Sequence, residues 1–203
     1  MLVSGGNMIY SSRMLLDKYS KYANPFNKIR DEVKSNRLVK ICRGLYEDDK
    51  LVSPMFLASY IYSPSYISFE YALSYYGLIP EHAVNVTSAS FNKNKSKKYR
   101  TPYGTFIYRD IPKDVFGLYT ELKEEKGYSY IMASKEKALC DLLYIKKPTR
   151  TIREFKELLF DDLRIDKMLF NNLDKHILLD LSSRYKKKNL KLLNEYLNGV
   201  LYE

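Results

Sequence analysis

The chain has 203 residues, of which 45% are hydrophobic and 29% are charged, with two cysteines and a formal net charge of +10. A chain of this length can bury a core without disulfide cross-links, and Cys42 and Cys140 lie in apolar patterns that favour buried free thiols. No stretch approaches the roughly 20 apolar residues that span a bilayer, and the N-terminus lacks a signal-peptide pattern, so we expect a cytoplasmic protein without membrane association. The positive charge favours a polyanionic partner such as nucleic acid but does not establish one.

A first helix is predicted over residues 8–20, where apolar residues recur at helical spacing. Ile9, Met14 and Leu15 are expected to face inward. A short connection over residues 21–23 then leads to a second helix.

The second helix is predicted from its own start signals. Asn24 can cap it by accepting backbone N–H bonds, and Pro25 suits the first helical position because its missing N–H costs nothing there. Phe26, Ile29 and Val33 recur at i, i+3 and i+7, so we expect one apolar stripe along this helix.

A two-stranded ribbon is predicted directly after the second helix. Residues 38–42 alternate between apolar and basic side chains, Arg43 and Gly44 suit a tight turn, and residues 45–47 return. Two helices followed by such a ribbon are typical of a winged helix-turn-helix, in which the second helix fits the major groove of DNA. We therefore predict a DNA-binding domain over residues 1–50.

The candidate DNA contacts lie on this helix and ribbon. Asn27 and Arg30 are the best candidates for base edges, because amide and guanidinium groups make bidentate hydrogen bonds there. Phosphate contacts are expected from Lys21, Lys34, Arg37 and Lys40. Arg43 is expected to enter the minor groove or to lie along the DNA backbone. The predicted set is Lys21, Asn27, Lys28, Arg30, Lys34, Arg37, Lys40 and Arg43. The alternative is ordinary solvated charge on a module for protein contacts, which Asp31 and Glu32 on the same helix favour.

Residues 51–203 are predicted to form a second domain, mixed α+β to about residue 145 and helical from about 149. Its predicted elements, in chain order, are a helix at 55–61, a strand at 66–67, a helix at 69–76 capped by Ser68, strands at 83–89, 98–101, 104–110 and 128–132, and a helix capped by Ser134. In the helical region, three apolar stripes are expected to pack inward: 152, 155 and 159; 163, 168, 169 and 173; and 190, 193, 196 and 197. The overall fold class is therefore α+β.

A lysine-rich loop over residues 91–98 is the densest basic run. Lys93, Lys95, Lys97 and Lys98 are candidates for contact with a phosphate backbone or an acidic partner. A solvated hairpin loop explains the same residues equally well.

Catalytic and cofactor patterns are missing from the sequence. Neither His82 nor His176 has a second ligand at metal-binding spacing, and no glycine-rich phosphate loop is present. The acidic pair at residues 161–162 is interpreted as the charged start of a helix, and Asp141 as a structural hydrogen-bonding group. We therefore expect no catalytic residues, no metal, no cofactor and no enzymatic activity.

Several stretches, taken in order, resemble the AbiEi-type antitoxins of bacterial type IV toxin–antitoxin systems. The ribbon RLVKICRGLYE at 37–47 is similar to the family's G-x-L-x-x-x-x-R-G-x-Y, with Asn36 in place of the usual glycine. SFEYALSYYGLIPE at 68–81 is similar to S-x-x-S-A-L-x-x-x-G-L, and TPYGTFIYRDIP at 101–112 contains the family's Gly-x-Phe-x-Tyr. The most specific match is YIMASKEKALCDLLY at 130–144, which resembles I-A-x-x-E-K-A-L-x-D-L-x-Y.

The resemblance implies a winged-helix repressor of the protein's own operon, with operator DNA as partner. It also implies that the C-terminal region neutralises a nucleotidyltransferase-like toxin, without a stable complex of the two. Glu136, Lys137 and Asp141 fall in the signature, and we hypothesise that they form a buried lysine–carboxylate network that holds the middle region. A homodimer on a symmetric operator is expected, because one short helix and a wing bury little surface on DNA.

Two alternatives stay open. The first is a winged-helix transcription factor without a toxin partner. The second is an enzyme or RNA-binding protein whose middle region acts on nucleic acid, although the sequence lacks an acidic or histidine cluster for catalysis.

Overall fold

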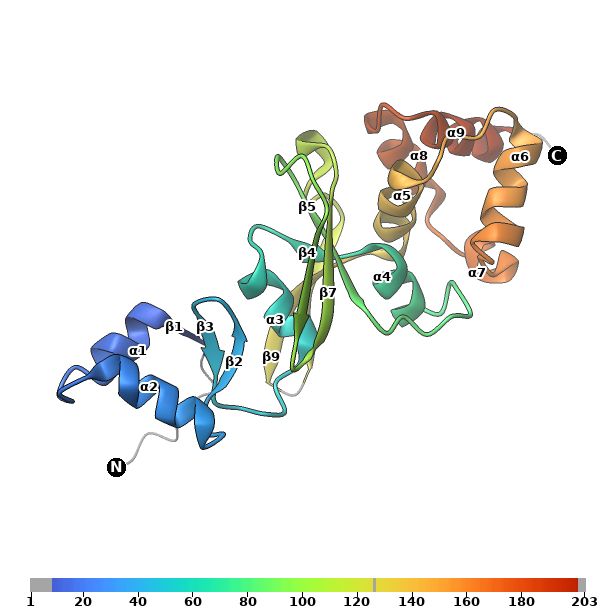
Figure 1. Cartoon of the computed structure of the whole chain (residues 1–203). Coiled ribbons are helices and arrows are strands. Elements are labelled where there is room, and N and C mark those ends of the chain that lie inside the picture. Colours follow the sequence, from blue (N-terminus) through green and yellow to red (C-terminus); the bar gives the residue numbers. More distant parts are fainter. Residues whose placement is uncertain (1–8, 126, 201–203) are drawn as a thin grey trace.

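The computed structural model describes residues 9–125 and 127–200 and contains helices and two sheets, which confirms the α+β class. Figure 1 shows three regions in a row: a small N-terminal unit, a larger sheet with flanking helices, and a group of C-terminal helices.

The N-terminal unit wraps two helices against a small antiparallel sheet. Its elements are β1 (Tyr10–Ser11), α1 (Ser12–Lys18), α2 (Pro25–Lys34), β2 (Val39–Cys42) and β3 (Leu45–Glu47). The strand order is β1-β3-β2, so the strand before the helices pairs with the hairpin that follows them.

The first helix is shorter than predicted. It begins at Ser12, because Tyr10 and Ser11 pair as a strand with β3, and Met8 lies outside the described residues. Ser11 caps the helix by accepting a hydrogen bond from the Met14 backbone N–H at 3.2 Å. Leu15 is buried as expected, but the Met14 side chain is 41% exposed, so the prediction that it faces inward is wrong.

The second helix forms where its start signals predict. The Asn24 Oδ1 atom accepts a hydrogen bond from the Asn27 backbone N–H at 3.0 Å, and Pro25 occupies the first turn. Ile29 is buried with Leu15 and Leu38 in a small core. Phe26 is 69% exposed, so the predicted apolar stripe fails at the start of the helix.

The central sheet has six strands in the order β6-β7-β5-β4-β9-β8. The strands are β4 (Tyr66–Ile67), β5 (Val86–Ser90), β6 (Lys97–Thr101), β7 (Gly104–Asp110), β8 (Thr120–Glu125) and β9 (Tyr128–Ala133). β5 runs parallel to β7 and β4 runs parallel to β9, whereas the other pairs are antiparallel. Helix α3 (Pro54–Ile61) covers one face, and α4 (Phe69–Tyr75) and α5 (Lys135–Ile145) cover the other (Figure 1).

Two features of this region differ from the sequence prediction. β8 was not predicted, because its sequence TELKEE lacks an apolar alternation; it is defined by pairing along its whole length with β9. Ser68 occupies the N-cap position of α4 but makes no capping hydrogen bond. A single 3₁₀ turn, η1 (Lys113–Val115), connects β7 to β8.

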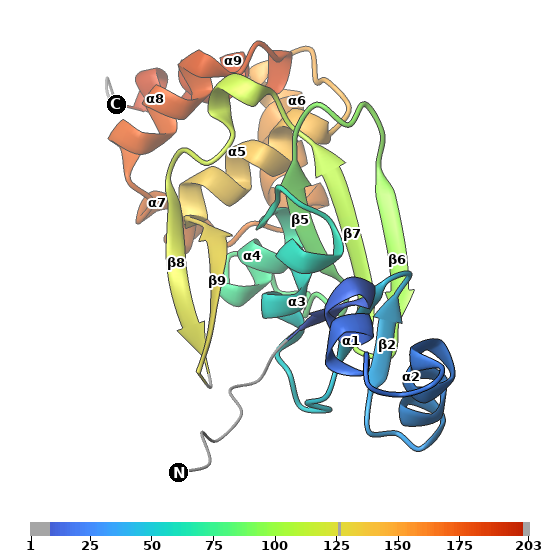
Figure 2. The same ribbon diagram turned by 90° about the vertical axis from the view of Figure 1, so that its left-hand side faces the viewer.

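The C-terminal helices pack on α5 and on one another, as Figure 2 shows. They are α6 (Ile152–Glu157), continued by the π-helical turn η2 (Leu158–Asp162), then α7 (Lys167–Asn171), α8 (Lys175–Arg184) and α9 (Lys188–Val200). Leu190, Leu193 and Leu197 are buried as predicted. Two predictions are wrong: Met168 and Leu169 are 78% and 39% exposed, and residues 161–162 end a helix instead of starting one.

The N-terminal unit touches the sheet through β2, which contacts β6. The central sheet, its flanking helices and the C-terminal helices share a second, larger core. Ile9 and Ile41 of the N-terminal unit are buried in this larger core and not in the small one. The Tyr103 hydroxyl donates a hydrogen bond to the Asp49 carbonyl at 2.8 Å, and the Tyr128 hydroxyl donates to the Asp49 carboxylate. Aliphatic packing and hydrogen bonds therefore both cross this junction.

Candidate nucleic-acid interface

Helix α2 is held by one face and leaves the opposite face in solvent. Ile29 packs in the small core, whereas Asn27, Arg30 and Lys34 are exposed. The Arg30 Nη2 atom donates a hydrogen bond to the Asn27 Oδ1 atom at 2.9 Å. The two side chains predicted to meet base edges therefore stand one turn apart, linked and accessible.

Glu32 has a different position from the one that its sequence suggests. Its side chain is buried and accepts hydrogen bonds from the Arg37 Nε and Nη2 atoms at 2.6 and 3.1 Å, while Lys28 Nζ lies at 2.7 Å. These two cations lower the pKa of Glu32 from 4.5 to about 2. The carboxylate is thus internally neutralised and does not oppose an anionic ligand, which leaves Asp31 as the exposed acid of the helix.

Lys28 and Arg37, both predicted DNA contacts, are the partners of Glu32. Lys28 Nζ also lies 5.0 Å from the centre of the Tyr22 ring. The Arg37 side chain is 61% exposed despite its ion pair, so part of its guanidinium still faces solvent. Through Glu32, both residues stabilise the C-terminal half of α2, independently of any contact with DNA.

The hairpin of β2 and β3 lies beside α2 and is short. Gly44 has a φ of +80°, which glycine adopts without strain, and its carbonyl accepts a hydrogen bond from the Ser12 N–H at 3.0 Å. The turn is therefore fixed against the start of α1, with the Arg43 side chain exposed. Lys40 on β2 and Lys21 between the helices are exposed as well.

A hollow of about 300 Å³ lies between the helix and the hairpin. Its walls combine apolar, aromatic and cationic side chains from α2, β2, β3 and the start of α1: Ser12, Phe26, Ile29, Arg30, Val33, Lys40 and Tyr46. Arg30 thus belongs both to the exposed polar face and to the rim of this hollow.

The lysine-rich run is only partly a loop. The backbone N–H groups of Lys93 and Asn94 donate to the Asp110 carboxylate at 2.5 and 2.6 Å, which fixes the chain there. Lys93 Nζ donates to the Ser63 carbonyl at 3.3 Å. Lys97 and Lys98 belong to β6, where neighbouring side chains point to opposite faces, so the four predicted lysines do not form one continuous contact.

The signature residues form the buried network that we hypothesised, with one difference. Lys137 and Asp141 are wholly buried, with Nζ and Oδ1 3.0 Å apart. The Tyr185 hydroxyl lies between them: Lys137 Nζ donates to it, and it donates to Asp141. Glu136 stands apart, where it accepts a hydrogen bond from the Asp174 backbone N–H at 3.1 Å.

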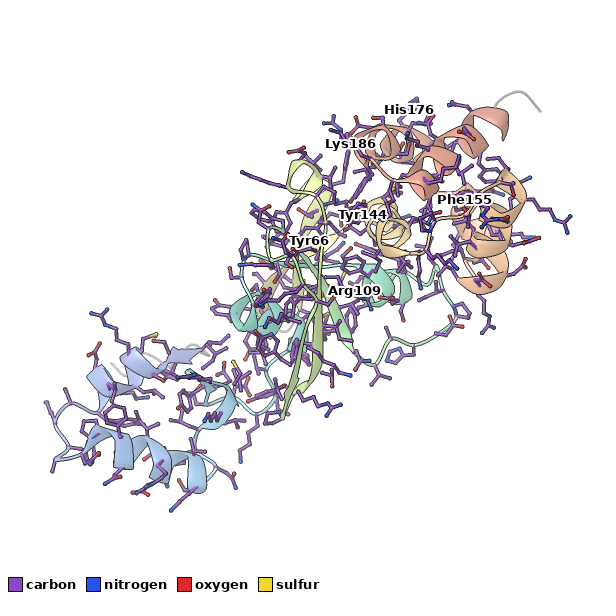
Figure 3. The ribbon with its side chains drawn as sticks, turned by 45° about the horizontal axis from the view of Figure 1, so that its top comes forward. Tyr66, Arg109, Tyr144, Phe155, His176 and Lys186 are labelled. Carbon is purple, nitrogen blue, oxygen red and sulfur yellow. The ribbon has the colours of Figure 1, made fainter. Side chains whose placement is uncertain are left out.

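The second carboxylate oxygen of Asp141 is bonded to residues of β4 and of the segment that follows it. It accepts hydrogen bonds from the Tyr66 hydroxyl at 3.0 Å and from the Ser68 hydroxyl at 2.7 Å. The Ser68 hydroxyl is therefore bonded to Asp141 and makes no capping hydrogen bond to α4. Burial raises the pKa of Tyr66 and Tyr185 well above 10, so both remain proton donors to the carboxylate. Figure 3 places Tyr66 in the sheet region facing the C-terminal helices, as its bond to α5 requires.

This network joins β4, α5 and the end of α8 and is closed to solvent, so its arrangement suits a structural role. Sequence reasoning found Lys137 and Asp141 but missed Tyr66 and Tyr185, which lie 75 and 44 positions from Asp141. Across residues 9–125 and 127–200, no group of three or more His, Cys, Asp or Glu side chains is arranged to hold a metal ion. In the same ranges no helix is both long and apolar enough to cross a membrane.

Comparison of the chain with protein-family models and with curated proteins gives no match.

Proposed function

We propose that this protein is a sequence-specific DNA-binding repressor that uses the exposed face of α2, with the β2–β3 hairpin as a wing. The observation that carries the proposal is the accessible Asn27–Arg30 pair, hydrogen-bonded at 2.9 Å on a helix whose other face is packed in a core. Both side-chain types make bidentate bonds to base edges in the major groove. Lys34, on the next turn, suits a phosphate.

The topology of the N-terminal unit supports the proposal. A strand before the two helices pairs with the hairpin after them, in the order β1-β3-β2, and a winged helix has the same arrangement of helix, recognition helix and wing. The internal neutralisation of Glu32 also supports it, because it removes one of the two acids that would repel DNA. The net charge of +10 favours the same partner.

We further propose that the repressor is the antitoxin of a toxin–antitoxin operon, as the resemblance of residues 11–145 implies. In this proposal the N-terminal unit represses the operon, and residues 51–203 counteract a nucleotidyltransferase-like toxin. Co-expression of the toxin with the full chain, and with Arg30→Ala, tests this division. The variant should lose repression and still protect cells; growth arrest with the wild-type chain would contradict the antitoxin role.

Two other functions make different predictions. A transcription factor without a toxin partner would not have a nucleotidyltransferase gene beside its own gene. An enzyme or RNA-binding protein acting through the middle region would keep its effect on nucleic acid after α2 is changed.

A gel shift on the DNA upstream of the protein's own gene tests the proposed interface. Arg30→Ala and Arg43→Ala should each weaken the shift. The matched control is Arg153→Ala, which removes the same charge from a side chain that is 90% exposed on α6. Unchanged binding by both Arg30→Ala and Arg43→Ala would contradict the proposed interface.

A further inference from the structure

Phe26 is the most exposed residue of the apolar pattern on α2, and it belongs to neither core formed by the described residues. Ile29, one turn away, is buried, whereas Phe26 is 69% exposed. A large apolar side chain on a helix start costs hydrophobic free energy as long as water covers it. A partner that covers the ring recovers that free energy.

The surroundings of the ring limit what this partner is. Phe26 forms a wall of the hollow between α2 and the hairpin, together with Val33 and Tyr46, and the cations of Arg30 and Lys40 line the same hollow. A well-fitting occupant presents an apolar group to the wall and negative charge to the two cations. A second copy of this chain fits poorly, because each copy carries a net charge of +10.

Thymine in duplex DNA has the required combination. Among the four bases it alone presents a methyl group in the major groove, and apolar side chains such as Phe contact that methyl. Its flanking phosphates supply the negative charge. Asn27 follows Phe26 in the sequence, and Arg30 lies about one helical turn further on. Both are positioned to read the neighbouring bases.

We infer that Phe26 is a specificity-determining residue that recognises a thymine by its 5-methyl group, which enters the hollow between Phe26 and the β2–β3 hairpin. The inference rests on the proposed DNA-binding function, since it names one base that α2 reads. Arg30 reads the base beside that thymine, and Lys40 holds a neighbouring phosphate.

Replacement of thymine by 2′-deoxyuridine tests the inference, because uracil lacks only the methyl and keeps the hydrogen-bonding groups. The full-length protein first selects duplexes from a random-sequence pool. Each thymine of the selected site is then replaced singly by deoxyuridine, and binding is measured by fluorescence anisotropy. Wild-type protein should lose about four-fold in affinity at one or two positions, the value expected for one buried methyl group.

The same series with Phe26→Ala assigns the effect to the ring. This variant should bind thymine DNA about as weakly as the wild type binds the deoxyuridine DNA, and it should no longer distinguish the two. Met168→Ala, which removes another largely exposed apolar side chain from α7, should behave like the wild type. Thermal melting of both variants checks that each is folded.

Three results would overturn the inference. The first is selective binding that depends on Arg30 but is insensitive to every deoxyuridine replacement, or equally sensitive in Phe26→Ala; the proposed function would then stand without it. The second is that the wild type is an oligomer without DNA and Phe26→Ala is a monomer, measured by light scattering. A second copy of the chain would then be what covers the ring in the wild type. The third is that no duplex is selected, in which case the proposed function fails as well.

Discussion

Lys137 and Asp141 lie one turn apart on α5 with neither side chain exposed, and their Nζ and Oδ1 atoms are 3.0 Å apart. Removing one member of such a pair leaves an uncompensated charge in the interior, which costs more than the intact pair contributes. The hydroxyls of Tyr66, Ser68 and Tyr185 add hydrogen bonds to the carboxylate. The pair therefore connects the sheet to the C-terminal helices.

Lys137→Met should lower the free energy of unfolding by about 3–5 kcal/mol, measured by urea denaturation. Arg153 and Glu157 give a matched control, because they form an i, i+4 pair with side chains 90% and 51% exposed. Arg153→Met should give no measurable loss, since exposed pairs contribute little.

The double variant Lys137→Met with Asp141→Asn should lose less than the sum of the two single variants. Neither buried position then carries a charge, and the asparagine still bonds the hydroxyls. Additive losses would mean that the two charges do not interact.

Glu32 should make stability depend on pH in acid. Because its pKa is lowered from 4.5 to about 2 in the folded protein, the unfolded chain binds more protons between these pH values. Its contribution is present above about pH 4.5 and is lost as the pH falls toward 2. The free energy of unfolding is measured against pH at low ionic strength. Glu32→Gln should lack this pH dependence, whereas Asp31→Asn, at the neighbouring exposed acid, should retain it. If the free energy of unfolding of Glu32→Gln changed with pH as steeply as that of the wild type, the lowered pKa would be contradicted.

Glu47 should act in the opposite direction. Burial at the junction raises its pKa from 4.5 to about 7, and its Oε2 atom has no hydrogen-bond partner within the described chain. Between these pH values the folded protein keeps a proton that the unfolded chain has released, so stability falls as the pH rises. The stability of Glu47→Gln relative to the wild type should therefore increase from about pH 4.5 to pH 7. Glu195→Gln, at an exposed position on α9, should show a constant difference.

Local chemistry made part of the structure predictable. The start of α2 follows from Asn24 and Pro25, and that of α5 from Ser134, whose hydroxyl oxygen accepts a hydrogen bond from the Lys137 N–H at 3.2 Å. The turn at Gly44 follows from glycine's freedom at positive φ. Each of these depends on residues within three positions of one another.

The missed features depend on contacts that no local sequence pattern shows. β1 exists because Tyr10 and Ser11 pair with β3, and a helical pattern cannot show that pairing. The periodicity of α2 marks Phe26 as apolar but does not show where the core ends. From the sequence Glu32 is expected to be a solvated surface acid, because the helical pattern does not show its ion pair with Arg37.

Phosphate contacts should be separable from base contacts. Lys34→Ala removes one exposed cation from α2, so it should weaken binding to all duplexes alike and reduce the slope of log affinity against log salt by about 1. Lys188→Ala, at an exposed lysine of α9, should leave the slope unchanged. Equal slopes for the wild type and Lys34→Ala would remove Lys34 from the interface.

The Asn27–Arg30 face of α2 is the surface that we propose reads DNA sequence. Its most direct test is the ratio of affinities for the upstream DNA and for a scrambled duplex of equal length, measured at one salt concentration for wild type and Arg30→Ala. We predict a large ratio for the wild type, which falls by about 10-fold or more in Arg30→Ala while scrambled-duplex binding changes little. A wild-type ratio near one, or an unchanged ratio in Arg30→Ala, would contradict the claim.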